Sequence, residues 1–141
     1  MSTEATRAVL SQAFADLFAA QYPAVPLSFE NRKFSQQAQE PFVDFNIVQT
    51  GRERKNIGTN RFVRTKSMVV IEIYVPEDSG TKTLYEMSDY IGENLEEGHF
   101  PVSGKQNITT LTHTQQHDGK EHGFYRQTVM VPFWFDSAFE S

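Results

Sequence analysis

Six of the thirteen cationic side chains of this 141-residue chain lie within the segment TGRERKNIGTNRFVRTK, residues 50–66. They are Arg52, Arg54, Lys55, Arg61, Arg64 and Lys66, and Glu53 is the only acidic residue among them. The segment therefore has a net charge of +5 while the whole chain has −5, so the remaining residues carry −10. Clustered arginines and lysines bind phosphates, anionic membranes or acidic proteins, and they also occur on solvated loops.

Three histidines in the last third of the chain are the candidate metal ligands: His113, His117 and His122. Histidines four residues apart face the same side of a helix and can share a metal ion. This segment is predicted to be a strand pair instead, because Asp118-Gly119 is the typical centre of a two-residue hairpin turn. That turn pairs His117 with Lys120 and spreads the three imidazoles along a ribbon. We therefore expect exposed histidines and no metal site.

The carboxylates give no catalytic signature either. Five of the eighteen lie on one face of a predicted helix, and none lies in a motif that raises its pKa for acid or base catalysis. Nucleophile-elbow, phosphate-loop, dinucleotide-binding and zinc-protease motifs do not occur in the sequence. The chain has no cysteine, which excludes disulfides and thiolate metal sites. We expect no enzymatic activity and no cofactor.

The elements that position these residues follow from the hydrophobic periodicity. Residues 3–22 predict an amphipathic helix whose apolar face comprises Val9, Leu10, Ala13, Phe14, Leu17 and Phe18. The segments 41–50 and 67–76 alternate apolar and polar residues, as half-buried strands do. Two such strands on either side of the basic segment predict a hairpin with a long flexible tip, and we call residues 51–61 the arm.

A second amphipathic helix is predicted after Pro76, with a capping box from Thr83 to Glu86. Its buried face comprises Leu84, Met87, Ile91 and Leu95. The opposite face is acidic and comprises Glu86, Asp89, Glu93, Glu96 and Glu97. Two β-rich runs around Asp118-Gly119 follow, and Pro132 inside the last run predicts a sheet edge or a bulge at that residue.

Together these elements predict a single domain over residues 1–141. The fold class is α+β, with a mostly antiparallel sheet of four to five strands, two main helices packed on one face and an extended hairpin arm. The first residues lack the pattern of a signal peptide, and the apolar runs are too short to cross a membrane. We expect a soluble, unexported chain.

An arm of one charge and a helix face of the other favour contact between copies of the chain. DNA binding is disfavoured, because Phe62 is the only aromatic residue in the basic segment and the rest of the chain is acidic. A head-to-tail contact between identical copies closes into a ring if the rotation allows it. The expected interface residues are Arg52, Arg54, Lys55, Arg61, Arg64, Lys66, Glu86, Asp89, Glu93 and Glu96.

The order of segments resembles the tail terminator, or tail completion, proteins of long-tailed bacteriophages. The resemblance begins with the leading helix and YPAVPLSFENRKF after it, which contains Val25, Pro26, Glu30 and Asn31. It continues with the hairpin and its basic arm, Pro76 at the end of the returning strand, and Gly80 before the second helix. The chain then closes on an aromatic-rich strand, GFYRQTVMVPFWFD.

The resemblance implies a virion protein that forms a ring, hexameric in that family, on the head-proximal end of the tail tube. Such a ring ends tube polymerisation and offers the surface for head-tail joining. The implied partners are other copies of the chain, the tail tube protein and a head-tail connector or neck protein. Genomic DNA passes through the channel without specific binding, and neither a membrane nor a cofactor is involved. Assembly would take place in the host cytoplasm, and the arm would reach a neighbouring subunit or the tube.

Two alternatives stay open. The chain could be another phage neck or tail component, such as a head-tail joining protein or a tube subunit, and purified tube subunits form long tubes. It could also be a nucleic-acid-binding module, which would bind DNA with an affinity that falls steeply as salt rises.

Overall fold

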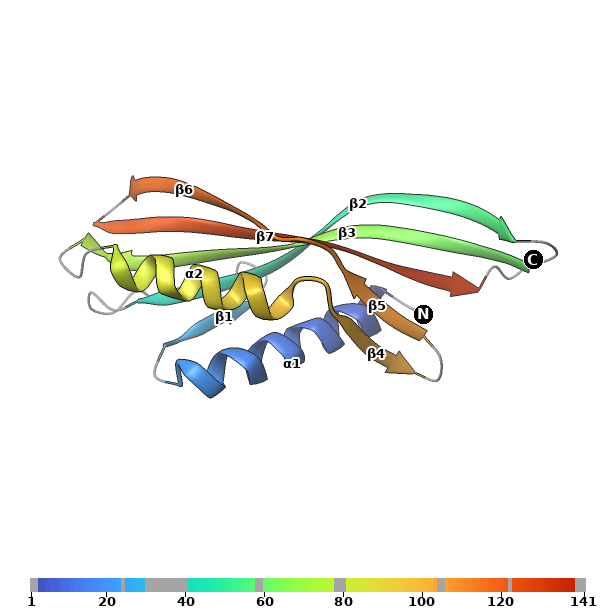
Figure 1. The fold of residues 1–141 in the computed structure, drawn as a ribbon, viewed down its shortest axis with the longest axis horizontal. Coiled ribbons are helices and arrows are strands. Elements are labelled where there is room, and N and C mark those ends of the chain that lie inside the picture. The colour runs from blue at the N-terminus through green and yellow to red at the C-terminus, as the bar shows by residue number, and fades with distance from the viewer. Residues whose placement is uncertain are drawn as a thin grey trace.

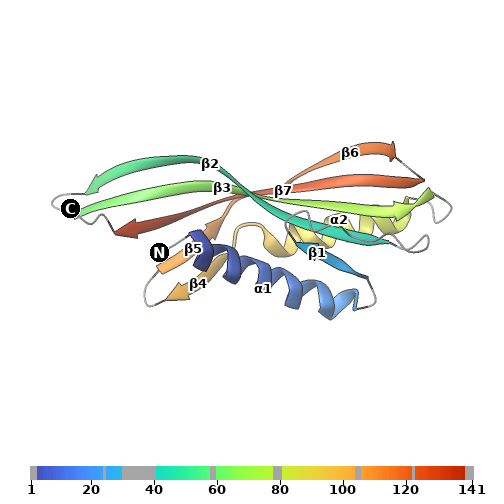
Figure 2. The same cartoon turned by 180° about the vertical axis from the view of Figure 1, so that it is seen from behind.

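The computed structural model describes residues 3–23, 25–29, 41–57, 60–77, 81–103, 106–121 and 123–138. The elements are, in chain order, α1 (Thr3–Gln21), β1 (Leu27–Phe29), β2 (Phe42–Ile57), β3 (Asn60–Pro76), α2 (Lys82–Leu95), β4 (His99–Ser103), β5 (Gln106–Thr110), β6 (Thr114–Glu121) and β7 (Phe124–Ala138). Figures 1 and 2 show one long, strongly twisted sheet with both helices on the same side of it. The predicted α+β class with two helices on one face is confirmed.

The sheet has seven strands in the described residues, so the predicted number of four to five is wrong. The strand order is β1-β2-β3-β7-β5-β4, and β6 pairs with the same edge of β7 as β5 does. All pairs are antiparallel except β1 with β2. The run expected as one strand before Asp118 is divided into β5 and β6, because the chain leaves the sheet at residues 111–113.

The core lies between the helices and one face of the sheet, which we call the inner face. Both predicted helices are confirmed, and their buried side chains are Leu10, Phe14 and Phe18 of α1 and Leu84, Met87, Ile91 and Leu95 of α2. Alternate residues of β3, from Val69 to Val75, are buried against them, while Met68 and Val70 point to the opposite, outer face. Tyr90 also joins the helices by donating a hydrogen bond to the Leu17 carbonyl at 2.7 Å.

The arm is an extension of the sheet rather than the long flexible tip that was predicted. β2 and β3 pair continuously out to Ile57 and Asn60, and the connecting residues 58 and 59 lie outside the described residues. β7 also pairs with β3 as far as Phe62. The hydrogen-bond ladder of this third strand supports a polar segment in which none of the described side chains, those of residues 51–55, is buried. The arm therefore presents its cations from fixed strand positions.

Pro132 lies in the interior of the sheet, so the prediction of an edge strand or bulge at this residue is wrong. Its carbonyl accepts a hydrogen bond from the Leu111 N–H at 2.8 Å. In an antiparallel strand the backbone nitrogen and carbonyl of one residue point to the same edge. The nitrogen of Pro132, which carries no hydrogen, therefore faces residues 111–113. The sheet accepts proline here because the neighbouring strand is interrupted between β5 and β6.

Asp118-Gly119 does not form the predicted turn. β6 continues to Glu121, which pairs with Phe124, so the chain reverses between these two residues. The register shifts at Gly119, whose φ of +82° is a left-handed conformation that glycine adopts without steric cost. The dipeptide is thus a β-bulge inside β6. The Asp118 carboxylate packs against the neighbouring strand β7, where it accepts a hydrogen bond from the Thr128 hydroxyl at 2.6 Å.

α2 begins at Lys82, and its N-cap residue Thr81 makes no side-chain capping hydrogen bond. The predicted capping box at Thr83 is therefore wrong. Thr83 already lies within the first helical turn, whereas a capping residue must precede it in a non-helical conformation.

Candidate assembly interface

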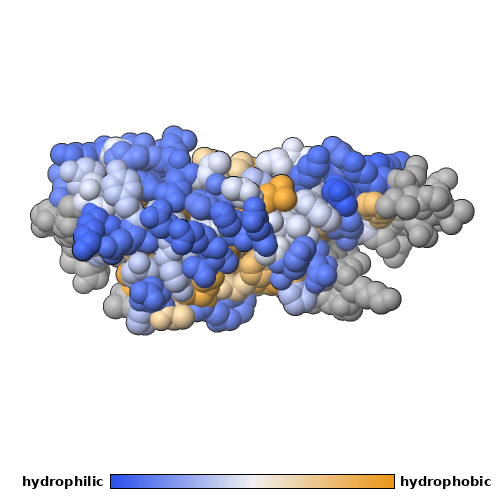
Figure 3. Space-filling model, viewed as in Figure 1, coloured by the Kyte–Doolittle hydropathy of each residue, from blue (hydrophilic) through white to orange (hydrophobic). Residues whose placement is uncertain are grey.

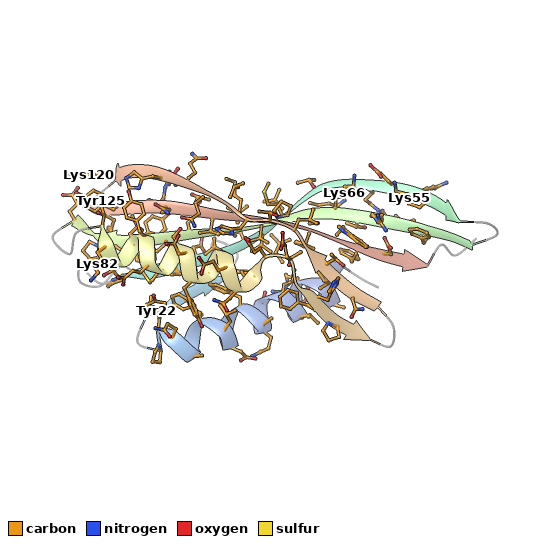
Figure 4. The ribbon with its side chains drawn as sticks, viewed as in Figure 1. Tyr22, Lys55, Lys66, Lys82, Lys120 and Tyr125 are labelled. Atoms are coloured by element: carbon orange, nitrogen blue, oxygen red, sulfur yellow. The ribbon has the colours of Figure 1, made fainter. Side chains whose placement is uncertain are left out.

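The six cations of the basic segment come from two adjacent strands at one end of the molecule. Figure 4 shows Lys55 and Lys66 at that end, and Lys82 and Lys120 at the other. The pairing register places Glu53 beside Arg64 and Arg54 beside Val63. Because side chains alternate between the two faces of a strand, the cations are divided between the outer and inner faces of the sheet.

On the outer face, Glu53 binds two of the cations. Its carboxylate contacts the Lys55 ammonium at 2.9 Å and the Lys66 ammonium at 2.9 Å. Hydrogen bonds from these two lysines lower the pKa of Glu53 to about 2. Lys55 and Lys66 are half-exposed, so the cluster stays accessible although one carboxylate already neutralises part of its charge.

Arg64 is the most firmly held cation on the outer face. Its Nε and Nη2 donate to the two carboxylate oxygens of Asp136 at 2.9 and 3.2 Å. The guanidinium also stacks on Trp134, 3.8 Å from the ring centroid. These contacts raise the pKa of Arg64, chiefly through the hydrogen bonds to Asp136. Sequence reasoning missed Asp136 and Trp134, because they lie about seventy positions away and only the β3–β7 register brings them to Arg64.

Arg52 and Arg54 lie on the inner face of the sheet, at the arm end. Arg52 is paired with Thr65 and Arg54 with Val63, and both arginines are exposed. The bulge between Gln49 and Gly51 precedes them. The Arg61 side chain lies outside the described residues.

The acidic face of α2 is confirmed in part. Glu86, Asp89 and Glu93 are exposed, and α2 lies along the half of the molecule away from the arm (Figure 1). Glu86 is 3.8 Å from Lys82, and Asp89 accepts a hydrogen bond from Gln115 at 3.0 Å. Glu96 lies in a different setting, since it caps the C-terminus of α2 and contacts His113.

His113 takes part in a polar seam between α2 and the β6–β7 pair. The Nδ1 atom of His113 is 2.7 Å from the Glu96 carboxylate, and its Nε2 is 3.0 Å from the Gln115 amide nitrogen. Gln115 in turn accepts hydrogen bonds from Ser88 and Gln127. Sequence reasoning missed this seam, because its members are polar residues scattered over α2, β6 and β7.

The predicted pairing of His117 is wrong, because the register places it opposite Gln127 instead of Lys120. Among the described residues, no three side chains of metal-ligating type converge on one point. His122 lies outside the described residues.

A second surface, on the outer face, was also missed by sequence reasoning. We call it the apolar band, and its residues are Val48, Met68, Val70, Leu111, Met130, Pro132 and Trp134. In the space-filling view, apolar surface is found near the middle of the molecule and between the helices, while the left end of the long sheet is mostly hydrophilic (Figure 3). In the described part of the chain, neither helix has the length and apolar character needed to span a bilayer.

The comparisons with known proteins bear on the fold. No protein-family model matches the sequence, and no curated protein matches it. A protein of solved structure, whose name states no function, is similar over 100% of this chain and 99% of its own. The TM-score is 0.75 and the sequence identity is 14%. At this identity the similarity extends to the fold alone, and it covers the whole chain.

Proposed function

We propose that this chain is a structural virion protein, a tail terminator subunit that forms a ring on the head-proximal end of a phage tail tube. The observation that carries the proposal is the separation of charge along the molecule. Exposed Arg52 and Arg54 lie on the arm, and exposed Glu86 and Glu93 lie on α2 in the other half. Together with the order of elements, this separation supports assembly from identical copies.

The proposed lateral contact joins the arm of one subunit to the α2 face of the next. Such a contact uses two different patches, so it is heterologous and generates a ring when the rotation closes. Arg52 and Arg54 are two residues apart on a strand, about 7 Å. Asp89 and Glu93 are four residues apart on a helix, about 6 Å. The two spacings match, so two charge pairs can form side by side.

In the proposed function the ring, of six subunits, works through surfaces and not through catalysis. One face of the ring covers the last ring of the tube protein and prevents further addition. The opposite face receives the head-tail connector or neck protein, and DNA passes through the central channel without specific contacts. The protein would act in the neck region of the virion after assembly in the host cytoplasm.

The lateral contact is tested by reversing each charged patch separately. An arm variant carries Arg52→Glu and Arg54→Glu, and a helix variant carries Asp89→Lys and Glu93→Lys. Each variant alone should need a roughly tenfold or greater rise in concentration to form rings, because like charges then face each other. Native mass measurement reads the assembly state. Lys120→Glu is the control for a charge reversal outside the arm, because Lys120 is exposed at the opposite end of the molecule, and it should leave ring formation unchanged.

Mixing the two variants gives the decisive result. The acidic arm of the arm variant attracts the basic helix face of the helix variant. The basic arm of the helix variant still attracts the acidic helix face of the arm variant. The mixture should therefore form rings in which the two variants alternate, with an even number of subunits. Rings that persist in both separate variants would refute the lateral contact. Long tubes formed by the purified protein would identify a tube subunit instead of a terminator.

A further inference from the structure

The apolar band crosses the outer face at the centre of the sheet. One row runs through Val48 of β2, Met68 of β3 and Pro132 of β7, which are neighbours in the pairing register. Leu111 lies beside Pro132 at the end of the row, where the chain leaves the sheet, and its N–H donates a hydrogen bond to the Pro132 carbonyl at 2.8 Å. Val48 is 50% exposed and Leu111 is 45% exposed. Three large apolar side chains are exposed in the described residues, and two of them, Val48 and Leu111, lie at the two ends of this row.

Further apolar side chains widen this row on both sides. Val70 and Met130 are paired in the adjacent outer-face row, and Trp134 lies in the row on the arm side. All three are only half-buried, whereas the inner-face residues between them, such as Val69 and Val131, are buried. In both views of the ribbon the helices and β4 lie on the inner side (Figures 1 and 2). No described element covers the band.

The two flanks of the band carry opposite charge. Lys66 is the outer-face neighbour on the arm side and Lys55 lies beyond it, and because Glu53 binds both lysines the three residues carry a net charge of +1. On the other side lie Glu72 and its partner Asp44. Charged neighbours surround an exposed apolar centre, which is the anatomy of a protein interface.

From this arrangement we infer that the outer face binds the outer face of a second copy of the chain. The contact is two-fold, with its axis along the row from Val48 to Leu111. A rotation about this axis places band on band and brings the Lys66 side of one copy over the Glu72 side of the other. A two-fold axis along the strands would instead place Glu72 over Glu72, which like-charge repulsion disfavours.

This contact goes beyond the proposed ring contact and differs from it in kind. It is isologous, so it closes at two copies and joins chains whether or not they belong to a ring. Sheets that pack face to face keep their strands within about 30° of alignment at a separation of about 10 Å. The exposed ends of the row would then lie beside the same residue of the partner: Val48 beside Val48 and Leu111 beside Leu111.

The inference is tested in the arm variant Arg52→Glu/Arg54→Glu, which removes the proposed lateral contact. Sedimentation velocity over a concentration series should show dimers of this variant. Adding Val48→Asp and Leu111→Asp should weaken the dimer by roughly a hundredfold, because four charges enter an apolar contact. Tyr85→Asp is the matched control, since Tyr85 is 44% exposed but lies on α2. An arm variant that stays monomeric at all concentrations, or a dimer unchanged by the Val48 and Leu111 substitutions, overturns the inference.

Cross-linking fixes the direction of the axis, and the chain has no cysteine of its own to interfere. A short bismaleimide should link Val48→Cys to a second Val48→Cys chain, and Leu111→Cys to a second Leu111→Cys chain. A mixture of the two should give few mixed links, because the ends of the row are three strand spacings, about 14 Å, apart. Efficient linking of Val48→Cys to Leu111→Cys would contradict the proposed axis. Failure of these tests leaves the ring test untouched, since the two contacts use different residues.

Discussion

Glu53 is the residue whose electrostatics the structure defines most sharply. Hydrogen bonds from Lys55 and Lys66 lower its pKa to about 2 from 4.5. We predict that changing both lysines to Gln raises the pKa of Glu53 back toward 4.5, which an NMR pH titration of the side-chain carboxyl measures. Because the folded-state pKa is the lower one, the interaction stabilises the arm above about pH 4.5 and is lost as the pH falls toward 2.

The matched control for this titration is Lys120→Gln, which removes a cation from the far end of the molecule. It should leave the Glu53 titration unchanged. A wild-type Glu53 that titrates near 4.5 would show that the two lysines do not bind it in solution. The same result would free both lysines for a partner and would weaken the assignment of Arg52 and Arg54 as the principal arm contacts.

At the scale of elements, the packing of α2 against the segment after β5 depends on Gly92. A Cβ atom at this position would lie 2.3 Å from the His113 ring, which Glu96 holds in place. We predict that Gly92→Ala destabilises the fold by about 1 to 3 kcal/mol, because His113 must leave its site. This figure is the net change, because the gain in helix propensity of about 1 kcal/mol offsets part of the cost of the clash. Urea unfolding measures the difference.

A second substitution separates this clash from other effects of the alanine. His113→Ala removes the ring that the new Cβ would meet, so the double variant should lose much less on Gly92→Ala than the wild type does. A Gly92→Ala protein that is as stable as the wild type would mean that α2 and residues 111–113 are not in contact as described.

The elements could be predicted from the sequence where a hydrophobic period marks them. Both helices and the alternating parts of β2 and β3 carry such a period, and their buried faces agree with it. The arm has no hydrophobic period, because charged residues form most of it. Its strand structure depends on the β2–β3–β7 pairing, and β7 is far away in sequence. The position of Pro132 was predicted wrongly because it too depends on residues distant in sequence. An interior proline is tolerated only because the neighbouring strand is interrupted between β5 and β6. Asp118-Gly119 is equally compatible with a turn and with a bulge.

The candidate interface was only partly predictable for a related reason. Charge clusters are visible in sequence, so the arm and the α2 face could be identified. Which cations are already bound inside the subunit depends on cross-strand neighbours, and Asp136 cannot be assigned to Arg64 without the register. The apolar band is a property of three strands side by side. In β3 and β7 most of its residues alternate with buried apolar residues of the inner face, so the sequence shows one apolar run and does not indicate which of its members are exposed.

At the scale of the whole molecule, the long sheet separates the basic arm from the acidic α2 face (Figure 1). A subunit of this shape can contact one neighbour through each end, which is the requirement for a closed ring. Its net charge of −5 opposes non-specific binding to the DNA that would pass through the channel. The proposal therefore predicts assembly with protein partners and little affinity for DNA at any salt concentration.

Electron microscopy of the purified protein, alone and mixed with phage tail tube subunits, tests the central claim most directly. The proposal predicts closed rings of the protein alone and tubes of finite length that carry such a ring at one end. A protein that stays monomeric at every concentration, and whose addition leaves tube length and tube ends unchanged, would contradict it.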